Sequence, residues 1–237
     1  MGKSHRRQKA EKKPRKPLTK AQVNDLALAY VARFATSAGK LESYLKRKLR
    51  ERGFVDDAAE SGADPYDADA YQEPFDPDAI IGPVITRFVE HGYVDDAGYA
   101  QSRASGLMHR GYGARRVNQA LVQAGIDEQI RADVAPGESE RRRAIVRMAK
   151  KRRIGPFAKD AEAGLGGSMQ DEASIDYDER RKLNDSARKL REKHLAALVR
   201  AGHGFSEASV VLDAPNEASL EEWIDEAREE EEDGLGK

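Results

Sequence analysis

The sequence predicts an all-α protein built from three tandem three-helix repeats. Apolar residues recur at three- and four-residue spacings along most of the chain, as on one face of a helix. Three helix ends also coincide. In each, a leucine lies four residues before a glycine, and an apolar residue and a short helix follow; the three glycines are Gly53, Gly125 and Gly202. The copies are roughly 70 to 80 residues apart, a spacing lengthened by two inserted loops.

Composition supports thin, elongated helical packing rather than one thick core. Of the 237 residues, 39% are hydrophobic and 35% are charged, and the mean hydropathy is −0.77. The absence of cysteine excludes disulfides, zinc–thiolate sites and cysteine nucleophiles. No apolar run approaches the roughly 20 residues of a membrane span, and the basic N-terminus lacks the apolar stretch of a signal peptide. We therefore expect a soluble, cytoplasmic protein with no membrane association.

Charge is strongly segregated although the formal net charge is only −1. Residues 1–22 are basic and residues 215–237 are acidic, so we expect two disordered charged termini. The basic tail either strengthens nucleic-acid binding by counterion release or only keeps the protein in solution. The sign contrast suggests a further hypothesis, in which the acidic tail folds over a basic face and restrains binding.

The first repeat is predicted over residues 23–94. Its first helix begins near Asn24 or Asp25, either of which can cap it. A second helix with one strongly basic face ends at Gly53. Residues 56–76 are acidic and loop-forming, which indicates an insertion. A third helix follows Pro77 and closes at Gly92.

The second repeat, residues 95–136, is the only copy without an insertion. Its first helix begins at Asp95 and Asp96 and ends near residue 110, where Gly111 supplies a positive φ. Gly113 is an acceptable N-cap for the next helix, whose apolar positions have i, i+3, i+4, i+7 spacing. That helix stops at Gly125, and a short third helix follows.

The third repeat is predicted over residues 138–214. A basic helix over 139–153 opens it, and a Gly-rich loop insertion over 154–177 follows. A long polar helix over 178–201 then ends before Gly202, and a short helix over 206–213 closes the repeat. Each repeat is thus expected to contribute three helices.

No catalytic or metal-binding constellation is apparent. The five histidines lack metal-ligand spacing, and no serine lies in a G-x-S-x-G elbow. Gly111 and Gly113 form only the first half of a dinucleotide fingerprint, because Arg116 stands where the third glycine would be. The sequence therefore predicts a protein that is not an enzyme and that uses no cofactor or metal.

Basic helix faces remain as the candidate functional feature. Clusters of cations occur near helix ends or turns in all three repeats. Solvated helix faces explain most such clusters, but three in corresponding places can form an extended positive surface for DNA phosphates or an acidic protein groove. The candidate contact residues are Lys46, Arg47, Arg50, Arg110, Tyr112, Arg115, Arg116, Arg142, Arg143, Lys150, Arg152 and Arg153.

Several of these segments resemble RecX, the bacterial regulator of RecA. The central repeat carries the resemblance through Gly92-Tyr-Val-Asp-Asp96, Arg110-Gly-Tyr-Gly-Ala-Arg-Arg116 and Ala124-Gly-Ile126. Residues 44–54 are similar to the first repeat of that family, and residues 144–153 with 195–205 to the third. The resemblance spans roughly residues 24 to 214. It is fairly specific only when the central elements are taken together.

The resemblance implies a curved array of three-helix repeats that binds along the groove of the RecA–single-stranded DNA filament. It implies limited filament growth, lower RecA ATPase, recombinase and coprotease activity, and so a role in DNA repair and the SOS response. The family has no catalytic residues, so only a surface-contact role transfers, to Arg110, Tyr112, Arg115, Arg116 and the first-repeat basic helix. The alternative is a helix-turn-helix-like protein that binds nucleic acid directly, without RecA, with Asn118 and Gln119 as its evident base-reading side chains.

Overall fold

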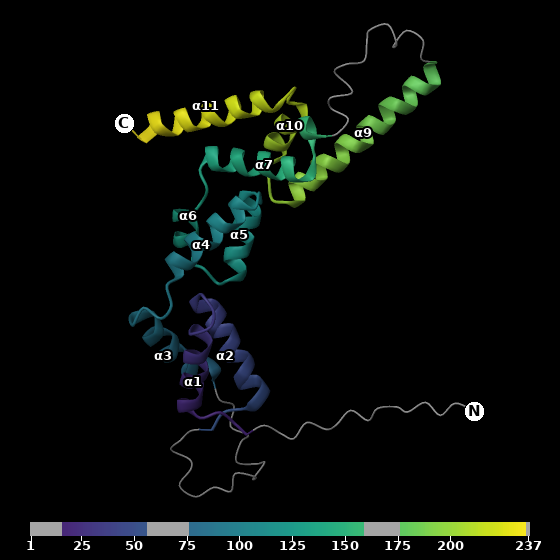
Figure 1. Cartoon of the computed structure of the whole chain (residues 1–237). Coiled ribbons are helices and arrows are strands. Elements are labelled where there is room, and N and C mark those ends of the chain that lie inside the picture. Colours follow the sequence, from purple (N-terminus) through teal and green to yellow (C-terminus); the bar gives the residue numbers. More distant parts are fainter. Residues whose placement is uncertain (1–15, 56–75, 159–175, 236–237) are drawn as a thin grey trace, which may run out of the picture. The chain divides into compact units, whose positions relative to one another are not determined.

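The computed structural model describes residues 16–55, 76–158 and 176–235 (Figure 1). In these ranges the regular elements are helices, and the single β-bridge joins Leu18 to Phe54. The predicted all-α class is therefore confirmed. The chain divides into two compact units, residues 1–95 and 96–237.

The first unit contains α1 (Lys20–Val31), α2 (Ala38–Arg52) and α3 (Pro77–Glu90). Helix α1 begins earlier than Asn24 or Asp25, the two caps predicted for it. Thr19 caps it instead: its Oγ1 accepts from the Gln22 N–H at 3.4 Å, and the Gln22 side chain accepts from the Thr19 N–H at 3.4 Å. This reciprocal capping box satisfies two amides that have no partner inside the helix.

The core of the first unit lies between its three helices. Its buried residues come from every helix and from the segments beside them: Leu18, Val23, Ala27, Leu41, Leu45, Leu49, Ile81, Val84, Phe88 and Val94. Leu18 also pairs its backbone with the end of α2, because its N–H donates to the Gly53 carbonyl at 3.0 Å and its carbonyl accepts from the Val55 N–H at 2.9 Å. The start of α1 and the end of α2 are thereby held together.

The second unit opens with α4 (Asp96–His109), α5 (Ala114–Gln123) and α6 (Glu128–Asp133). Helix α5 buries Val117 and Leu121, and Ala124 beyond its end, against α4, as the apolar spacing predicts. Asp127 caps α6 by accepting from the Gln129 N–H at 2.8 Å.

The remaining helices of the second unit are α7 (Glu138–Arg152), α9 (Tyr177–Arg200) and α10 (Phe205–Asp213), with a short 3-10 turn η2 (Gly155–Phe157) after α7. The insertion expected from residue 154 begins later than predicted, because Ile154 is 2% exposed and belongs to the core. The rest of that insertion, and the acidic insertion over 56–75, lie outside the described residues.

The repeated helix ending has the predicted backbone. Gly53, Gly125 and Gly202 have φ values of +77°, +71° and +99°. The leucine four residues before each glycine is at most 1% exposed. Each repeat therefore ends its leucine-bearing helix at a glycine in a conformation that other residues rarely adopt.

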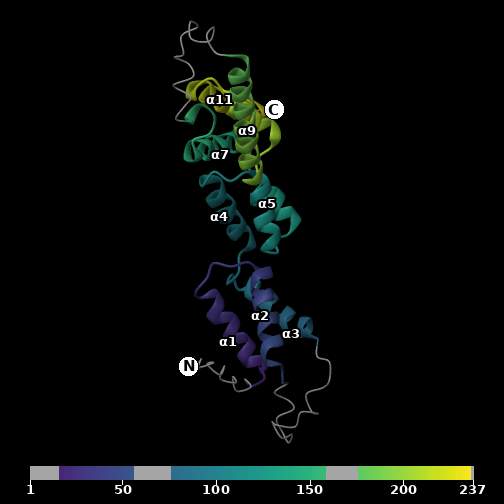
Figure 2. The same ribbon diagram turned by 90° about the vertical axis from the view of Figure 1, so that its right-hand side faces the viewer.

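The acidic C-terminus differs from the prediction of a disordered tail. Residues 217–235 form α11 (Glu217–Leu235), which lies along α7 (Figures 1 and 2). Leu220 and Ala227 are fully buried, and Trp223 and Ile224 pack against the same core. These four positions have the spacing of one helix face, a signal that the high charge of the segment obscured. Residues 1–15 of the basic N-terminal tail lie outside the described residues. The disordered tail predicted over residues 1–22 is wrong at its end, because Leu18 is buried in the core and α1 begins at Lys20.

No helix within the described ranges combines the length and the apolar character needed to cross a membrane.

Candidate anion-binding surface

An arginine-lined hollow lies between α4 and α5 in the second repeat. We call it the α4–α5 hollow; its volume is about 400 Å³, and it is lined by Arg103, Leu107, Arg110, Tyr112, Arg116, Gln119, Ala120 and Gln123. Three of these side chains are cationic and none is acidic. Because no carboxylate among the lining residues neutralises the arginines, the hollow favours anionic groups such as phosphates and carboxylates.

The Gly-Tyr-Gly turn positions the arginines at the edge of this hollow. Arg110 follows the last residue of α4, and Arg116 is in the first turn of α5. Gly111 has φ +85°, and a Cβ there would lie 3.0 Å from the Met148 backbone nitrogen on α7. The glycine therefore provides both a positive φ and close packing against α7.

Gly113 allows an equally close approach to the end of α9. A Cβ on Gly113 would lie 2.3 Å from the Gly202 carbonyl carbon, and its N–H donates to the Ala201 carbonyl at 3.0 Å. The Arg115 N–H donates to the Gly202 carbonyl at 3.2 Å. Free amides at the start of α5 thus meet free carbonyls at the end of α9, which aligns the two helix dipoles favourably. From the sequence Gly113 was expected only to cap α5, and this contact was missed.

His203 completes the contact between the turn and the end of α9. Its side chain is buried, and Nε2 lies 3.0 Å from the Gly111 carbonyl oxygen. A carbonyl only accepts, so Nε2 carries the proton, and Nδ1 has no hydrogen-bond partner among the described residues. Burial lowers the pKa of His203, although the Gly111 hydrogen bond and the charge of Glu207 partly oppose it. The neutral imidazole therefore helps to fix the turn.

The structure brings together three of the four predicted second-repeat contacts. Arg110, Tyr112 and Arg116 line the α4–α5 hollow, whereas Arg115 is exposed but is not among the lining residues. Arg103 lines the hollow as well and was not among the predicted contacts. Its position on α4, two helical turns before Arg110, was the available signal.

The two amides proposed to read bases are already engaged. Asn118 Oδ1 accepts from Arg131 Nη1 at 2.8 Å. Gln119 Oε1 accepts from Arg116 Nη1 at 3.2 Å, and Gln119 lines the hollow. Their oxygens are therefore committed within the repeat.

The predicted first-repeat contacts belong to the first unit. Lys46 lies 2.7 Å from Glu42 and 2.6 Å from Asp78, and hydrogen bonds to these carboxylates, Asp78 first, raise its pKa above the usual range. Arg47 and Arg50 are exposed on the same helix. Lys46 is thus already neutralised, whereas Arg47 and Arg50 point outward with looser contacts.

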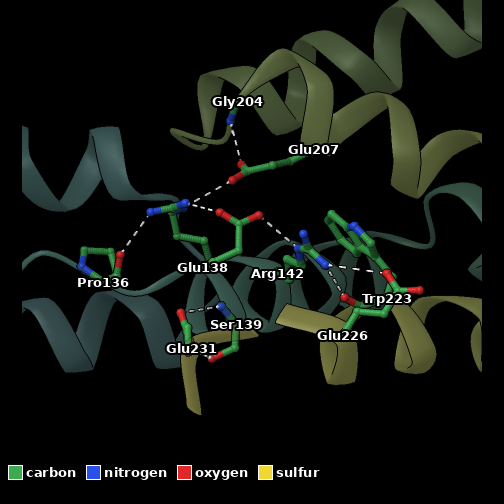
Figure 3. A network of polar contacts seen from close by, with 10 residues as sticks. Pro136, Glu138, Ser139, Arg142, Gly204, Glu207, Trp223, Glu226 and Glu231 are labelled. Carbon is green, nitrogen blue, oxygen red and sulfur yellow. Dashed lines mark hydrogen bonds and ion pairs between the residues drawn. The ribbon is translucent and has the colours of Figure 1, made fainter. Parts of the chain in front are cut away.

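In the third repeat, α11 covers part of the basic face of α7. Arg142 is only 14% exposed: its Nε lies 3.0 Å from Glu138, it donates to the Trp223 carbonyl, and its guanidinium lies 4.7 Å from the Trp223 ring centre (Figure 3). Lys150 pairs with Glu217 of α11. The open basic face predicted at Arg142 and Lys150 is therefore occupied by the C-terminal helix.

The other predicted third-repeat contacts are open. Arg143, Arg152 and Arg153 are exposed and have no ion-pair partner among the described residues. A nearby arginine, Arg147, donates instead to the carbonyls of Met108 at 3.3 Å and His109 at 3.1 Å, at the end of α4. Arg147 thus links α7 to the end of α4, directly before Arg110.

Helix α11 also supplies the cap that α7 lacks. The N-cap of α7 is Gly137, which has no side chain. Glu231 fills the place: its carboxylate accepts from the Ser139 N–H at 3.1 Å and from Ser139 Oγ at 2.6 Å (Figure 3). These hydrogen bonds lower the pKa of Glu231. A Cβ on Gly137 would lie 2.6 Å from the same carboxylate, so the glycine makes room for this remote cap.

In the part of the chain that the structure describes, no three His, Cys, Asp or Glu residues are grouped so as to hold a metal ion.

Residues 95–134 match the family model of the second three-helix domain of RecX. The regulatory protein RecX of Serratia proteamaculans is 33% identical over 109 residues, which cover 46% of this chain and 64% of that protein. The regulatory protein RecX of Myxococcus xanthus is 26% identical over 217 residues, covering 90% of this chain and 95% of that protein. The chain thus spans less than two thirds of the Serratia protein and nearly all of the Myxococcus protein.

Two solved structures are similar in fold at low identity. The crystal structure of RecX from Lactobacillus salivarius has a TM-score of 0.49 and 16% identity, covering 82% of this chain and 96% of that one. A second crystal structure, of regulatory protein RecX, has a TM-score of 0.47 and 16% identity.

The helices and the hollow together define a class of protein: an all-α chain of three-helix repeats with an arginine-lined surface. The domain match falls on the repeat that carries this hollow. Residues 95–134 thus match a RecX-type three-helix domain, and the chain as a whole is similar to regulatory proteins of the RecX family.

Proposed function

We propose that this protein binds RecA and the RecA–single-stranded DNA filament and mainly inhibits RecA ATPase, recombinase and coprotease activity. It would thereby regulate DNA repair from the cytoplasm, as a binding protein without catalysis of its own. The similarity to RecX regulatory proteins supports the regulatory role. The observation that carries the contact is the α4–α5 hollow, in which three arginines meet without an acidic neighbour among the lining residues.

The hollow suits a surface that presents several anionic groups. Arginine guanidinium groups bind phosphates and carboxylates through paired N–H donors, and they remain charged at any physiological pH. The turn between α4 and α5 is fixed by contacts with α7 and the end of α9, so Arg110 and Arg116 have little backbone freedom to lose on binding. Such preorganisation favours stable contact with a filament.

Titration of the protein into a RecA ATPase assay on single-stranded DNA tests the proposal. We expect the rate of ATP hydrolysis to fall as the protein approaches and exceeds stoichiometry with RecA. An unchanged rate at stoichiometric excess, with filament formation verified independently, would reject the proposed regulation of RecA.

The alternative of sequence-selective DNA binding without RecA is less well supported. Asn118 and Gln119 already accept hydrogen bonds from Arg131 and Arg116, so a base edge would have to replace these contacts. A duplex panel of different sequences, measured without RecA, separates the two functions. Strong preference for one sequence would favour the alternative.

A further inference from the structure

Three aromatic rings form a continuous ladder at the junction of α1 and α2 in the first unit. The Tyr30 and Tyr44 rings stack with their centres 4.4 Å apart and 19° between their planes. Phe34 contacts this pair in a tilted arrangement, with its ring centre 5.4 Å from that of Tyr30 and 50° between the two planes. The Phe34 side chain is 57% exposed, so the ladder ends in an accessible ring.

The connection between α1 and α2 holds the exposed ring in place. The Phe34 N–H donates to the Tyr30 carbonyl at 3.1 Å, which continues the helical hydrogen-bond pattern past the end of α1. Ser37, three residues later, is fully buried and caps α2 through the Lys40 N–H at 3.3 Å. Phe34 therefore lies on a short segment anchored at both ends, and little order has to be gained when a ligand binds.

The surroundings of the ladder are cationic. The guanidinium of Arg47 and the ammonium of Lys48 each lie 5.7 Å from the Tyr44 ring centre. Residues 30–51 contain six lysines and arginines and two acids, of which Glu51 pairs with Arg47 and Lys48. The side chain of Arg33, next to Phe34, is exposed and has no hydrogen-bond or ion-pair partner among the described residues. An exposed ring thus lies beside positive charge that can meet phosphates.

An isolated exposed phenylalanine needs no functional explanation. Phe205 is such a residue, since it is 64% exposed and no stacked ring partner is found for it among the described residues. Phe34 differs, because its ring contacts the stacked Tyr30–Tyr44 pair and the cation Arg33 is next to it in the chain. Rings that bases can stack on, combined with cations along the backbone path, are typical of proteins that bind single-stranded nucleic acid.

We propose that Phe34 is a stacking site for a base of single-stranded DNA, with Arg33 contacting a neighbouring phosphate. Duplex DNA keeps its bases stacked inside the helix and does not present a free face to the ring, so the site selects unpaired strands. This site belongs to the first unit, whereas the α4–α5 hollow belongs to the second. It adds a direct nucleic-acid contact to the proposed RecA regulation, but does not depend on it.

Fluorescence anisotropy of the full-length protein, without RecA, tests this site. The two probes are a labelled oligothymidylate and an abasic oligonucleotide of the same length, which retains the phosphates but lacks bases. We expect wild type to bind the oligothymidylate more tightly. Phe34→Ala should weaken oligothymidylate binding about tenfold, the effect of losing roughly one stacked base, and leave abasic binding unchanged.

Three variants control this experiment. Phe34→Trp keeps an aromatic face and should retain binding, whereas Arg33→Gln should weaken binding of both probes, since it removes a phosphate contact. Phe205→Ala removes an equally exposed ring elsewhere and should change neither. Thermal unfolding followed by circular dichroism checks that each variant is folded.

Equal wild-type affinity for the two probes, or unchanged oligothymidylate binding by folded Phe34→Ala, would overturn the stacking site. Loss of both probes' binding by Phe34→Ala would overturn it too, because stacking affects only the probe with bases. The RecA ATPase titration is independent of these measurements. Its failure alone would reject the proposed regulation and leave the stacking site intact.

Discussion

Replacing Gly113 with alanine should weaken the second unit severely, because the new methyl group has no space. Its Cβ would lie 2.3 Å from the Gly202 carbonyl carbon and oxygen and 2.5 Å from the His203 nitrogen, all of them backbone atoms. Relief requires the start of α5 to move away from the end of α9. Overpacking of this kind typically costs about 1–3 kcal/mol.

Such a movement also breaks two hydrogen bonds. These are the bonds from the Gly113 N–H to Ala201 and from the Arg115 N–H to Gly202, at 3.0 and 3.2 Å. Each contributes about 1 kcal/mol, so the free energy of unfolding should fall by roughly 3–5 kcal/mol in total. For a protein of this size that corresponds to a decrease in Tm of about 6–20 °C.

Circular dichroism melting of Gly113→Ala beside Gly106→Ala measures this effect. Gly106 lies in α4, and a Cβ added there would have no neighbouring atom within 4 Å, so the same substitution meets no clash. It should raise the stability slightly, by about 0.5–1 kcal/mol, since alanine is the better helix former. If Gly113→Ala melts within about 1 °C of wild type, the inferred close packing of α5 on the end of α9 is wrong.

Three further predictions concern the second unit. Burial lowers the pKa of His203 in the folded protein, so the contribution of the neutral side chain to stability is complete above the unfolded pKa of about 6.5 and is lost as the pH falls below that value. His203→Gln should therefore flatten this part of the Tm–pH profile. An unaltered profile would contradict the assignment of a buried, neutral His203. Glu231→Gln should lower the free energy of unfolding by about 1 kcal/mol at neutral pH, since it weakens the cap of α7. The difference from wild type should shrink as the pH falls below the unfolded pKa of about 4.5 and through the lower pKa of the native Glu231 carboxylate. A constant difference in urea titrations across this range would count against the cap. Deleting residues 217–235 should expose the buried surface under α11 and lower the Tm, and if melting is unchanged, α11 is no part of the fold.

Local backbone demands were the most predictable part of the fold. A helix that ends at a glycine and is followed by an apolar residue has few alternatives, so Gly53, Gly125 and Gly202 could be identified as equivalent before their φ values were known. The apolar face of α5 was predictable for the same reason, because its spacing matches the helical period.

Contacts between distant segments were not predictable in this way. Nothing near Gly137 in the sequence shows that its missing cap is supplied by Glu231, or that Gly113 is pressed against Gly202. The acidic run in α11 suggested a solvated tail, although Leu220 and Ala227 carry the apolar spacing of a packed helix. The periodicity of these apolar residues, not the net charge of the segment, indicates its structure.

The arginines beside the Gly-Tyr-Gly turn were predictable from the sequence, whereas those that depend on packing between helices were not. The arginines beside the Gly-Tyr-Gly turn were identified because a turn gathers them, and Arg110 and Arg116 do line one hollow. Arg103 requires the α4–α5 packing to be known. Arg142 was placed among the open cations because the sequence did not reveal that Trp223 covers it.

Binding of the protein to preformed RecA–single-stranded DNA filaments tests the central claim most directly. The comparison uses wild type, the Arg110→Glu/Arg116→Glu double variant, and Arg181→Glu, a control on α9 outside the lining of the hollow. The account predicts tight binding by wild type and by the control, and at least a tenfold loss, about 1.4 kcal/mol, for the double variant. Wild-type affinity in a folded double variant would contradict the claim that the α4–α5 hollow contacts the filament.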